Sequence, residues 1–438
     1  MPEGAVTVRS QAPRADTDST RKPRLLFVLP IVPWPIRRNG ISLRFAPVID
    51  YLAERYELQV LVLAEDDERL PSSTPLEQQR TGLAVLEVPI SSPRWLRRIK
   101  TLCYGLSPWS PPLSSSRYDG GRLERALLRY LDGKDYSAVI WAARHLEVAC
   151  RIRRRFTQTR FVIDVVDSPA LYSFRNAAGN RLVRMLTRYD GWKWRRQEQR
   201  AREAFDATIY ISNVDAQAVH AGRTARVHVV PNGIFHADAP PLTTAPASGR
   251  TIGFLGNMAY PPNISAALRL AQRIFPRILA TLADATLLII GRDPVPAISH
   301  LAGPRISVTG TVDNIWPYIT QANVFVFPMI EGTGLQNKIL EAMYASVPVV
   351  TTSIAANAMD ARSGEQLLVG DTDEEIVAQV VKVLGDWQYS TALAGRARAF
   401  VLREFSWPAI LPRYEAIVAP CNASGHRPRD SENPAGDQ

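Results

Sequence analysis

The sequence predicts two α/β domains of comparable size, each built on a parallel β-sheet. The chain has 438 residues, of which 46% are hydrophobic, so it is too long for one ordinary core and apolar enough for two. Short runs rich in Val, Ile and Leu alternate with longer amphipathic stretches, a pattern typical of parallel strands joined by crossover helices. This pattern occurs twice, and the first strand of the second series is followed by a linker rich in Pro, Ala, Thr and Ser that runs to Gly249.

The first series contains five predicted strands, at residues 25–29, 58–63, 138–141, 160–163 and 207–211. A proline-rich loop and a helix over residues 42–55 follow the first strand. A basic helical stretch over residues 167–205 precedes the last strand. We therefore expect residues 24–211 to form the first domain.

The second series contains six predicted strands, at residues 227–230, 251–255, 285–290, 306–308, 324–327 and 347–351. Helices are predicted at residues 264–280 and 335–344. We expect the second domain to span residues 212–401, and a helix within residues 402–419 to return toward the first domain. Residues 1–23 and 420–438 show no apolar periodicity and are expected to be disordered.

The net charge of +10 indicates an anionic partner, which could be a nucleic acid, a phospholipid surface or a phosphorylated substrate. Nucleic acid is disfavoured because the sequence has no zinc-finger spacing, no RNP-like aromatic strand and no lysine-rich tail. The three cysteines show neither metal-ligand nor disulfide spacing, which favours a reducing, cytoplasmic location without a bound metal or other cofactor. No apolar stretch reaches the roughly 20 residues that a membrane-spanning helix needs.

The most informative segment covers residues 324–343, where a buried strand runs into a loop with two glycines, Gly332 and Gly334. That loop opens a helix with a polar first turn. Backbone N–H groups at such a helix start attract phosphate, and glycine lets the ligand approach closely. The segment therefore predicts a diphosphate site at the carboxyl edge of the second sheet.

Lys338 and Glu341 lie three residues apart on this helix and so share a face. The lysine would neutralise a phosphate, and the carboxylate would accept hydrogen bonds from ribose hydroxyls, as an acidic residue does in dinucleotide-binding folds. By spacing alone the pair also fits a surface ion pair worth about 0.2–0.5 kcal/mol. Both interpretations stay open at this point.

Several motifs occur in a fixed order. The run GLQNKILEAM at residues 334–343, followed by VPVVTT at 347–352, resembles the donor-site signature of group 1 glycosyltransferases, also called glycosyltransferase family 4. Within that family it is similar to the branch with a Gly-apolar-Gln-Asn-Lys helix start. Resemblances to other family landmarks are found at residues 230–233 (VPNG), 254–258 (FLGNM), 260–263 (YPPN), 288–292 (LIIGR) and 309–312 (TGTV).

The resemblance implies the GT-B fold, in which two Rossmann-like domains face each other across a cleft. It also implies a retaining, metal-independent, hexosyltransferase-like activity. The partners would be a nucleotide-diphosphate sugar donor and a glycan or lipid-linked acceptor, with no nucleic acid. Cell-surface polysaccharide assembly is the expected role.

The same resemblance implies a set of donor-binding residues in the second domain. Glu341 would bind the ribose, the amides around Gly334 and Leu335 would hold the diphosphate, and the segment at Thr311 would meet the base. The full donor-binding set is Gly256, Asn257, Arg292, Thr311, Val312, Thr333, Gly334, Leu335, Gln336, Asn337, Lys338 and Glu341.

The sequence departs from the family pattern in two places. Many relatives carry a glutamate where this chain has Thr333, and Glu331, two residues earlier, is the candidate replacement. Relatives often carry an Arg and Lys pair after the position of Gly256, where this chain offers Asn257 and Asn263. Arg292 and Lys338 are then the best cations for the leaving diphosphate, a group whose charge an active site must stabilise.

In the first half, the loop PWPIRRNG ends at Gly40, and Arg44 follows one turn into the next helix. This loop is expected to reach the donor phosphate or the acceptor, although it also fits a proline-rich turn with a basic rim. His145 and Asp164 follow buried strands, where cleft residues of a parallel sheet lie. The catalytic candidates are Arg292, Lys338, Glu331 and His145. The acceptor or phosphate loop is assigned to Gly40, Arg44 and Asp164. A purely structural role for His145 stays an alternative.

Two stretches, residues 95–104 and 192–196, interleave aromatic rings with cations. Such segments suit peripheral contact with an anionic membrane, here the inner face of the plasma membrane. They equally suit a solvated helix face packed by its tryptophans.

Three rival functions differ in the residues they need. A sugar-nucleotide epimerase would need clustered carboxylates and a histidine, and a non-catalytic partner subunit would keep the fold without the chemistry. A nicotinamide-dependent oxidoreductase is disfavoured because no Gly-x-Gly-x-x-Gly turn follows the first strand.

Overall fold

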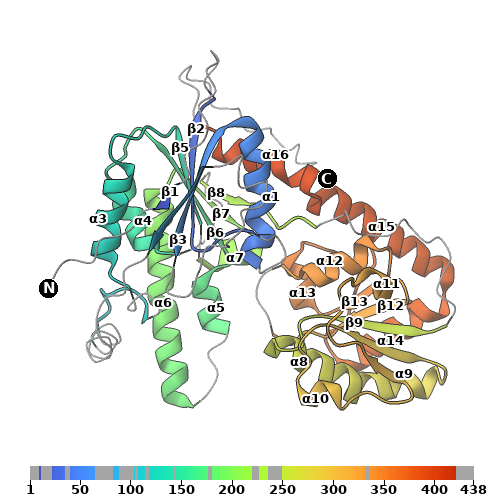
Figure 1. The fold of residues 1–438 in the computed structure, drawn as a ribbon. Coiled ribbons are helices and arrows are strands. Elements are labelled where there is room, and N and C mark those ends of the chain that lie inside the picture. Colours follow the sequence, from blue (N-terminus) through green and yellow to red (C-terminus); the bar gives the residue numbers. More distant parts are fainter. Residues whose placement is uncertain are drawn as a thin grey trace, which may run out of the picture.

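The computed structural model describes residues 9–10, 22–34, 40–64, 82–87, 103, 107–113, 118–142, 144–175, 180–219, 226–234, 249–331 and 335–420. These residues form two α/β domains, one blue to green and one yellow to orange-red in Figure 1, and the red C-terminal helix packs on the first of them. Two sheets, one in each domain, carry the two predicted series of strands. Among the described helices, none is long and apolar enough to cross a membrane.

The N-terminal sheet has the strand order β1-β4-β3-β2-β5-β6-β7-β8, and its strands are parallel except for β1. The order reverses direction between β2 and β5, which makes a topological switch point. The strands are β1 (Arg9–Ser10), β2 (Arg24–Leu29), β3 (Glu57–Ala64), β4 (Gly82–Glu87), β5 (Ala138–Ala142), β6 (Arg160–Val166), β7 (Ala207–Tyr210) and β8 (Val227–Val229).

Two features of this sheet correct the sequence predictions. The strand β8, which we assigned to the second series, pairs with β7 and therefore extends the first sheet. Arg9 and Ser10 pair with β4, although the leader was expected to be disordered, because backbone pairing at a sheet edge needs no apolar periodicity. The other leader residues up to 21, and the tail from 421, lie outside the described residues.

Helices cover both faces of the N-terminal sheet (Figure 1). One core joins the sheet to α1 (Gly40–Arg55) and α16 (Trp407–Val418), and the other joins it to α3 (Gly120–Leu131), α4 (Leu146–Arg153) and α6 (Arg181–Ala204). The shorter helices α5 (Pro169–Arg175) and α7 (Asn213–Val219) complete this domain.

The C-terminal sheet is fully parallel, with the order β11-β10-β9-β12-β13-β14 and a reversal between β9 and β12. Its strands are β9 (Thr251–Leu255), β10 (Thr286–Ile290), β11 (Ile306–Val308), β12 (Val324–Phe327), β13 (Val349–Thr351) and β14 (Leu368–Val369). Its helices are α8 (Pro261–Arg269), η3 (Leu270–Ile274), α9 (Phe275–Thr281), α10 (Pro296–Ser299), α11 (Trp316–Ile319), α12 (Asn337–Tyr344), α13 (Ser353–Ala358), α14 (Asp373–Gly385) and α15 (Trp387–Phe405).

The chain passes between the domains twice, near Ile234 and near Ser406, and these two segments lie against each other. The Ile234 amide donates to the Phe405 carbonyl at 2.9 Å, and Ile234 forms a β-bridge with Ser406, where α15 ends and α16 begins. Gly233 packs directly on the Trp407 ring, because a Cβ built there would lie only 2.6 Å from one ring carbon. The domains also meet at α7 and α13, where Asn213 hydrogen-bonds to Asp360.

A buried ion pair ties this crossing point to the N-terminal sheet. Arg44 in α1 and Asp164 in β6 are both essentially inaccessible to solvent and lie 2.8 Å apart. Arg44 also donates to the Asn232 side chain at 2.9 Å and to the Val230 carbonyl at 3.0 Å. The guanidinium therefore links a helix, a central strand and the segment that leaves the domain.

The contact at Gly233 gives a stability prediction. We expect Gly233→Ala to lower the free energy of unfolding by about 1–3 kcal/mol, because the added methyl group forces the Trp407 ring or the crossing segment to move. The control is Gly395→Ala in α15, where a Cβ meets nothing within 4 Å and should stabilise by about 0.5–1 kcal/mol. Thermal and urea unfolding measure both, and equal effects would contradict the packing argument.

Candidate active site

The strand order of the C-terminal sheet reverses between β9 and β12, and we call the space at the carboxyl ends of these two strands the candidate crevice. The chain leaves β9 through Gly256 and leaves β12 through Pro328, and it enters α12 from Leu335. Ligands bind at this position in open α/β sheets because the strand connections diverge there.

Glycines allow the loops around the crevice to approach one another. Gly291 has φ of +158°, and a Cβ on it would collide with the Gly256 carbonyl oxygen. A Cβ on Gly256 would lie 2.8 Å from the Asn263 amide nitrogen. The loops after β9 and β10 are further joined by a 2.9 Å hydrogen bond from the Met258 amide to the Arg292 carbonyl. Larger residues at either glycine would push these loops apart.

The helix α12 begins at Asn337, two residues later than predicted, with Gln336 as its N-cap. Gln336 makes no side-chain cap, so the N–H groups of the first turn point out of the helix without that partner. The Asn337 side-chain oxygen is buried and has no hydrogen-bond partner among the described residues. This helix start can therefore receive an anion together with a hydrogen-bond donor.

Lys338 lies beneath the crevice, half-buried against two rings. Its Nζ donates to the Asn263 side-chain oxygen and lies 5.6 Å from the Phe254 ring centroid and 5.8 Å from that of Phe327. Burial lowers the pKa of Lys338 to about 7, and no carboxylate of the described residues offsets this effect. A bound diphosphate would be a strong anionic partner for the ammonium and would favour its protonated form.

Asn263 connects this lysine to the loop after β9. Its amide nitrogen donates to the Asn257 carbonyl at 2.9 Å, while its oxygen faces Lys338. The Asn257 side chain is engaged in its own turn, accepting from the Ala259 amide at 2.9 Å. Asn263 therefore positions the lysine, and the loop does not supply a cation of its own.

The other predicted donor residues lie in the connections that follow the strands of the C-terminal sheet, or in α12. Glu341 is half-buried one turn after Lys338, and Arg292 is exposed, with Asp293 3.7 Å away. Thr311 is exposed and Val312 half-buried in the loop after β11, and Leu335 and Gln336 are half-buried before α12. Thr333 and Gly334 lie outside the described residues.

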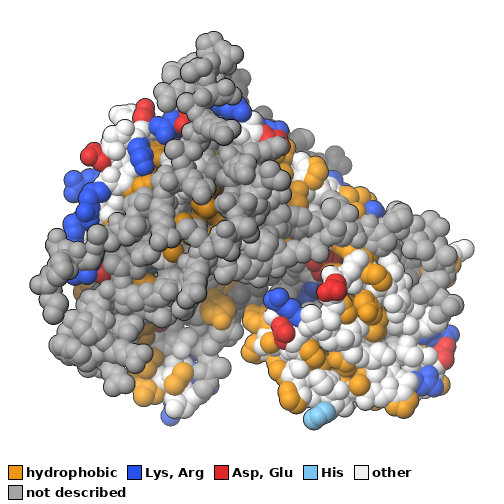
Figure 2. All heavy atoms as spheres, in the orientation of Figure 1, with side chains coloured by type: hydrophobic (Ala, Val, Ile, Leu, Met, Phe, Trp, Pro, Cys, Tyr) orange, Lys and Arg blue, Asp and Glu red, His pale blue; other side chains and the backbone are white. Residues whose placement is uncertain are grey.

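Tyr260 of the C-terminal domain lies near residues of the N-terminal domain. Its pKa is raised by burial first, and then by the ionised forms of Tyr172, Asp167 and Glu331. Loss of solvent around the carboxylate raises the pKa of Asp167 to about 6, and the nearby Asp215 adds to the rise, while much of the residue stays exposed. Figure 2 shows a notch between the two domains.

Part of the chain matches a protein family, and several known proteins are similar to it. Residues 249–386 match the family described as "Glycosyl transferases group 1". The phosphatidyl-myo-inositol mannosyltransferase of Mycolicibacterium smegmatis is 28% identical over 207 residues, which cover 45% of this chain and 52% of that protein. The chain thus matches about half the length of its curated relatives.

Solved structures resemble the chain over nearly its whole length. Sucrose-phosphate synthase from Thermosynechococcus elongatus superposes with a TM-score of 0.61 at 15% identity, covering 90% of this chain and 97% of that one. HepE from Anabaena, in complex with UDP and glucose, superposes with a TM-score of 0.56 at 15% identity, covering 89% and 98%. The chain has the GT-B fold. The predicted fold class is therefore confirmed.

Within this GT-B architecture, the structure corrects the expected roles of Arg44 and Asp164. Both were predicted to face the acceptor or a phosphate, but both are buried and paired with each other. Gly40 is exposed at the start of α1, and the preceding residues 35–39 lie outside the described residues. The alternation of strand and helix located the residues correctly but could not show which of them reach the cleft.

His145 ends the loop after β5 and is the N-cap of α4. It has φ of 57°, a left-handed conformation, and its ring lies edge-on to Tyr118 at 5.4 Å. The position is at the switch point between β2 and β5, where the sequence placed it. Its catalytic role stays a prediction.

Sequence reasoning missed the cleft contributions of Asp167, Tyr172 and Tyr260. Tyr260 stands in the quoted YPPN motif, and Tyr172 falls in a stretch read only as basic and helical. Their pairing depends on how the two domains face each other. Among the described residues, no group of three or more His, Cys, Asp or Glu side chains could hold a metal ion.

The lowered pKa of Lys338 gives a pH-dependent prediction. Since the folded pKa lies near 7 and the unfolded pKa near 10.5, the folded state carries a buried-charge penalty that is full below pH 7 and is relieved as pH rises. We expect Lys338→Met to raise the melting temperature, most at pH 6 and least near pH 10. Calorimetry across this range measures the effect, and a difference independent of pH would contradict the burial of the ammonium.

Proposed function

We propose that this chain is a retaining glycosyltransferase that moves a hexose from a nucleotide-diphosphate sugar to a glycan or lipid-linked acceptor. The C-terminal domain would hold the donor, and the N-terminal face at Asp167 and Tyr172 would receive the acceptor. The role proposed for it is cell-surface polysaccharide assembly at the inner face of the plasma membrane.

One observation carries the proposal. Lys338, with a pKa lowered to about 7, lies at the start of a helix without a side-chain cap, in the crevice of a parallel sheet. Its ammonium is held by the neutral side chain of Asn263. A buried lysine without a carboxylate partner is costly, and such groups are typical of sites that bind or activate a substrate. The match of residues 249–386 to group 1 glycosyltransferases supports a sugar-transfer role for this crevice.

The proposed chemistry is electrostatic. The bond between sugar and diphosphate breaks with negative charge building on the leaving group, and preorganised cations and N–H donors lower the barrier most. Lys338, the first turn of α12 and the exposed Arg292 would supply that charge without a metal. In a retaining reaction the acceptor hydroxyl attacks from the face that the diphosphate leaves, with its proton passing to a phosphate oxygen.

Glu331 and Asp167 are the proposed contacts to the reacting sugar and acceptor. Glu331 stands two residues before the position where relatives use a glutamate, and its charge contributes to the raised pKa of Tyr260. Asp167, with its pKa near 6, is still mostly ionised at neutral pH and can accept a hydrogen bond from an acceptor hydroxyl. Glu341 is proposed to bind the ribose.

Names of similar proteins guide the choice of substrates to test. One relative is a phosphatidyl-myo-inositol mannosyltransferase, and one structural neighbour was solved with UDP and glucose. We therefore propose to begin with UDP- and GDP-linked hexoses and with acceptors carried on a lipid.

A transfer assay tests the function directly. The protein is incubated with labelled nucleotide sugars and a lipid extract, and the products are separated into transferred sugar, epimerised donor and unchanged donor. We expect transfer, and Lys338→Met should slow it at least about 100-fold, while the surface substitution Lys382→Met should not. Epimerised donor would identify an epimerase, and binding without turnover would identify a partner subunit.

The ribose role of Glu341 predicts a specific loss of affinity. Glu341→Gln should weaken UDP binding about 10- to 100-fold, because a carboxylate that accepts hydroxyl hydrogen bonds is replaced by a neutral amide. The preference for UDP over its 2′,3′-dideoxy form should also fall. Calorimetric titration measures both, with the exposed Glu365→Gln as control, and an unchanged preference would refute the assignment.

A further inference from the structure

The first turns of α6 project from the N-terminal domain with their apolar side chains in solvent. Residues 181–186 are all exposed, and Leu182 and Met185 keep 59% and 60% of their surface accessible. Figure 1 shows this end of α6 extending beyond the rest of the domain, and hydrophobic and basic side chains gather at that end in Figure 2. Exposure of neighbouring large apolar side chains marks an interaction surface.

The exposed end continues into the outer face of the same helix. One face of the helix carries residues at steps of three or four, with Met185 beside them: Leu182, Leu186, Tyr189, Lys193, Arg196 and Arg200. Within this face Lys193 is buried and donates to the Ser110 hydroxyl. The opposite face packs inward, because Gly191 contacts Phe174 of α5 and Glu198 is fully buried. The apolar end is therefore not a piece of core left uncovered.

Two exposed tryptophans lie next along this face. The Arg196 guanidinium lies 4.2 Å from the Trp109 ring centroid and 5.9 Å from that of Trp192. Trp109 is 74% exposed and Trp192 is 44% exposed. Indole rings of this kind are enriched where a protein meets the boundary between hydrocarbon and water.

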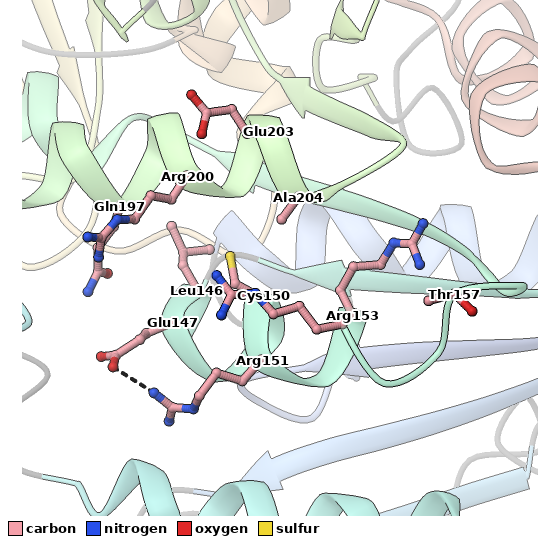
Figure 3. Close-up of a pocket in the computed structure, with 11 residues that line it drawn as sticks. Leu146, Glu147, Cys150, Arg151, Arg153, Thr157, Gln197, Arg200, Glu203 and Ala204 are labelled. Carbon is pink, nitrogen blue, oxygen red and sulfur yellow. Dashed lines mark hydrogen bonds and ion pairs between the residues drawn. The ribbon is translucent and has the colours of Figure 1, made fainter.

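A basic groove lies farther along the face, between α6 and α4. It has a volume of about 890 Å³ and no residue of the C-terminal domain lines it (Figure 3). Arg151 is bound by Glu124 and Glu147, each at 2.6 Å. Arg154 and Arg200 also line the groove and have no carboxylate partner among the described residues. Two guanidinium groups thus remain for an anion.

We propose that this face of α6 docks on an anionic phospholipid surface. Leu182, Met185 and Leu186 enter the hydrocarbon boundary, the tryptophans lie at the level of the headgroups, and Arg154 and Arg200 bind lipid phosphates. Leu186 precedes Trp192 by about 9 Å along the helix axis, and Trp192 precedes Arg200 by about 12 Å. This order of apolar, aromatic and cationic groups matches the order of layers at a membrane interface.

Charge disfavours a second copy of the chain as the occupant. Arg181, Arg184 and Arg188 flank the apolar end, and a two-fold contact between two such ends would bring these cations together. The same arginines favour an anionic membrane, where their side chains extend to phosphates. The inference deepens the proposed function, since it would bring a lipid-linked acceptor to the N-terminal domain, but the lipid binding itself is independent of turnover.

Vesicle flotation tests the docking surface. Phosphatidylcholine vesicles with about 30 mol% phosphatidylglycerol are compared with pure phosphatidylcholine vesicles. We expect the protein to bind the anionic vesicles selectively and to be released by about 0.5 M salt. The double substitutions Leu182→Asp with Met185→Asp, and Arg154→Glu with Arg200→Glu, should each lower partitioning at least about tenfold.

Matched controls lie on the C-terminal domain. Leu402→Asp and Arg305→Glu change exposed residues of the same kinds and should leave partitioning within about twofold. UDP binding and melting temperature are measured in every variant and should not change, so a failed lipid test remains distinct from a failed donor site.

Three results would overturn the proposal. The first is equal binding to neutral and anionic vesicles. The second is a concentration-dependent dimer that Leu182→Asp dissociates. The third is a melting temperature raised by free pyrophosphate, lost in Arg154→Glu with Arg200→Glu, without any binding to vesicles.

Discussion

The buried pair of Arg44 and Asp164 holds the N-terminal domain to the segment that leaves it. The Arg44 guanidinium donates hydrogen bonds to the Asp164 carboxylate, to the Asn232 side chain and to the Val230 carbonyl. The Tyr414 ring of α16 lies 6.0 Å from it. Breaking such a pair on one side leaves a buried charge without compensation, which costs about 3–5 kcal/mol. The Arg44 guanidinium thus contacts both the segment that leaves the first domain and the helix α16 that returns to it.

The C-terminal domain holds a second cation, the half-buried Lys338, which has no carboxylate partner among the described residues. Lys338 is held by a neutral amide and two rings, and burial lowers its pKa to about 7. Arg44 is stabilised by its partners, whereas Lys338 is left for a ligand to complete. The contrast distinguishes a cation that is paired within the fold from one that we propose to bind a substrate, and it follows from the carboxylates that each meets among the described residues.

The outer face of α6 adds a third kind of cationic environment, where Arg200 is exposed and Arg196 lies beside the exposed rings of Trp109 and Trp192. The inner face of α6 packs against α5 and against the sheet. One helix thus supports the fold on one side and presents a surface on the other. Because the donor crevice belongs to a different domain, the two sites can be altered independently.

The sequence by itself determined the two parallel-sheet domains, the glycine-rich start of α12 and the positions of Lys338 and Glu341, because periodicity and local motifs are encoded by neighbouring residues. It failed at β8 and at Arg44 with Asp164, whose partners lie far away in the chain. It also missed Asn263 as the partner of Lys338 and the meeting of Asp167, Tyr172 and Tyr260. Only the tertiary structure decided these points, since burial, ion pairing and pKa depend on which distant segments pack together.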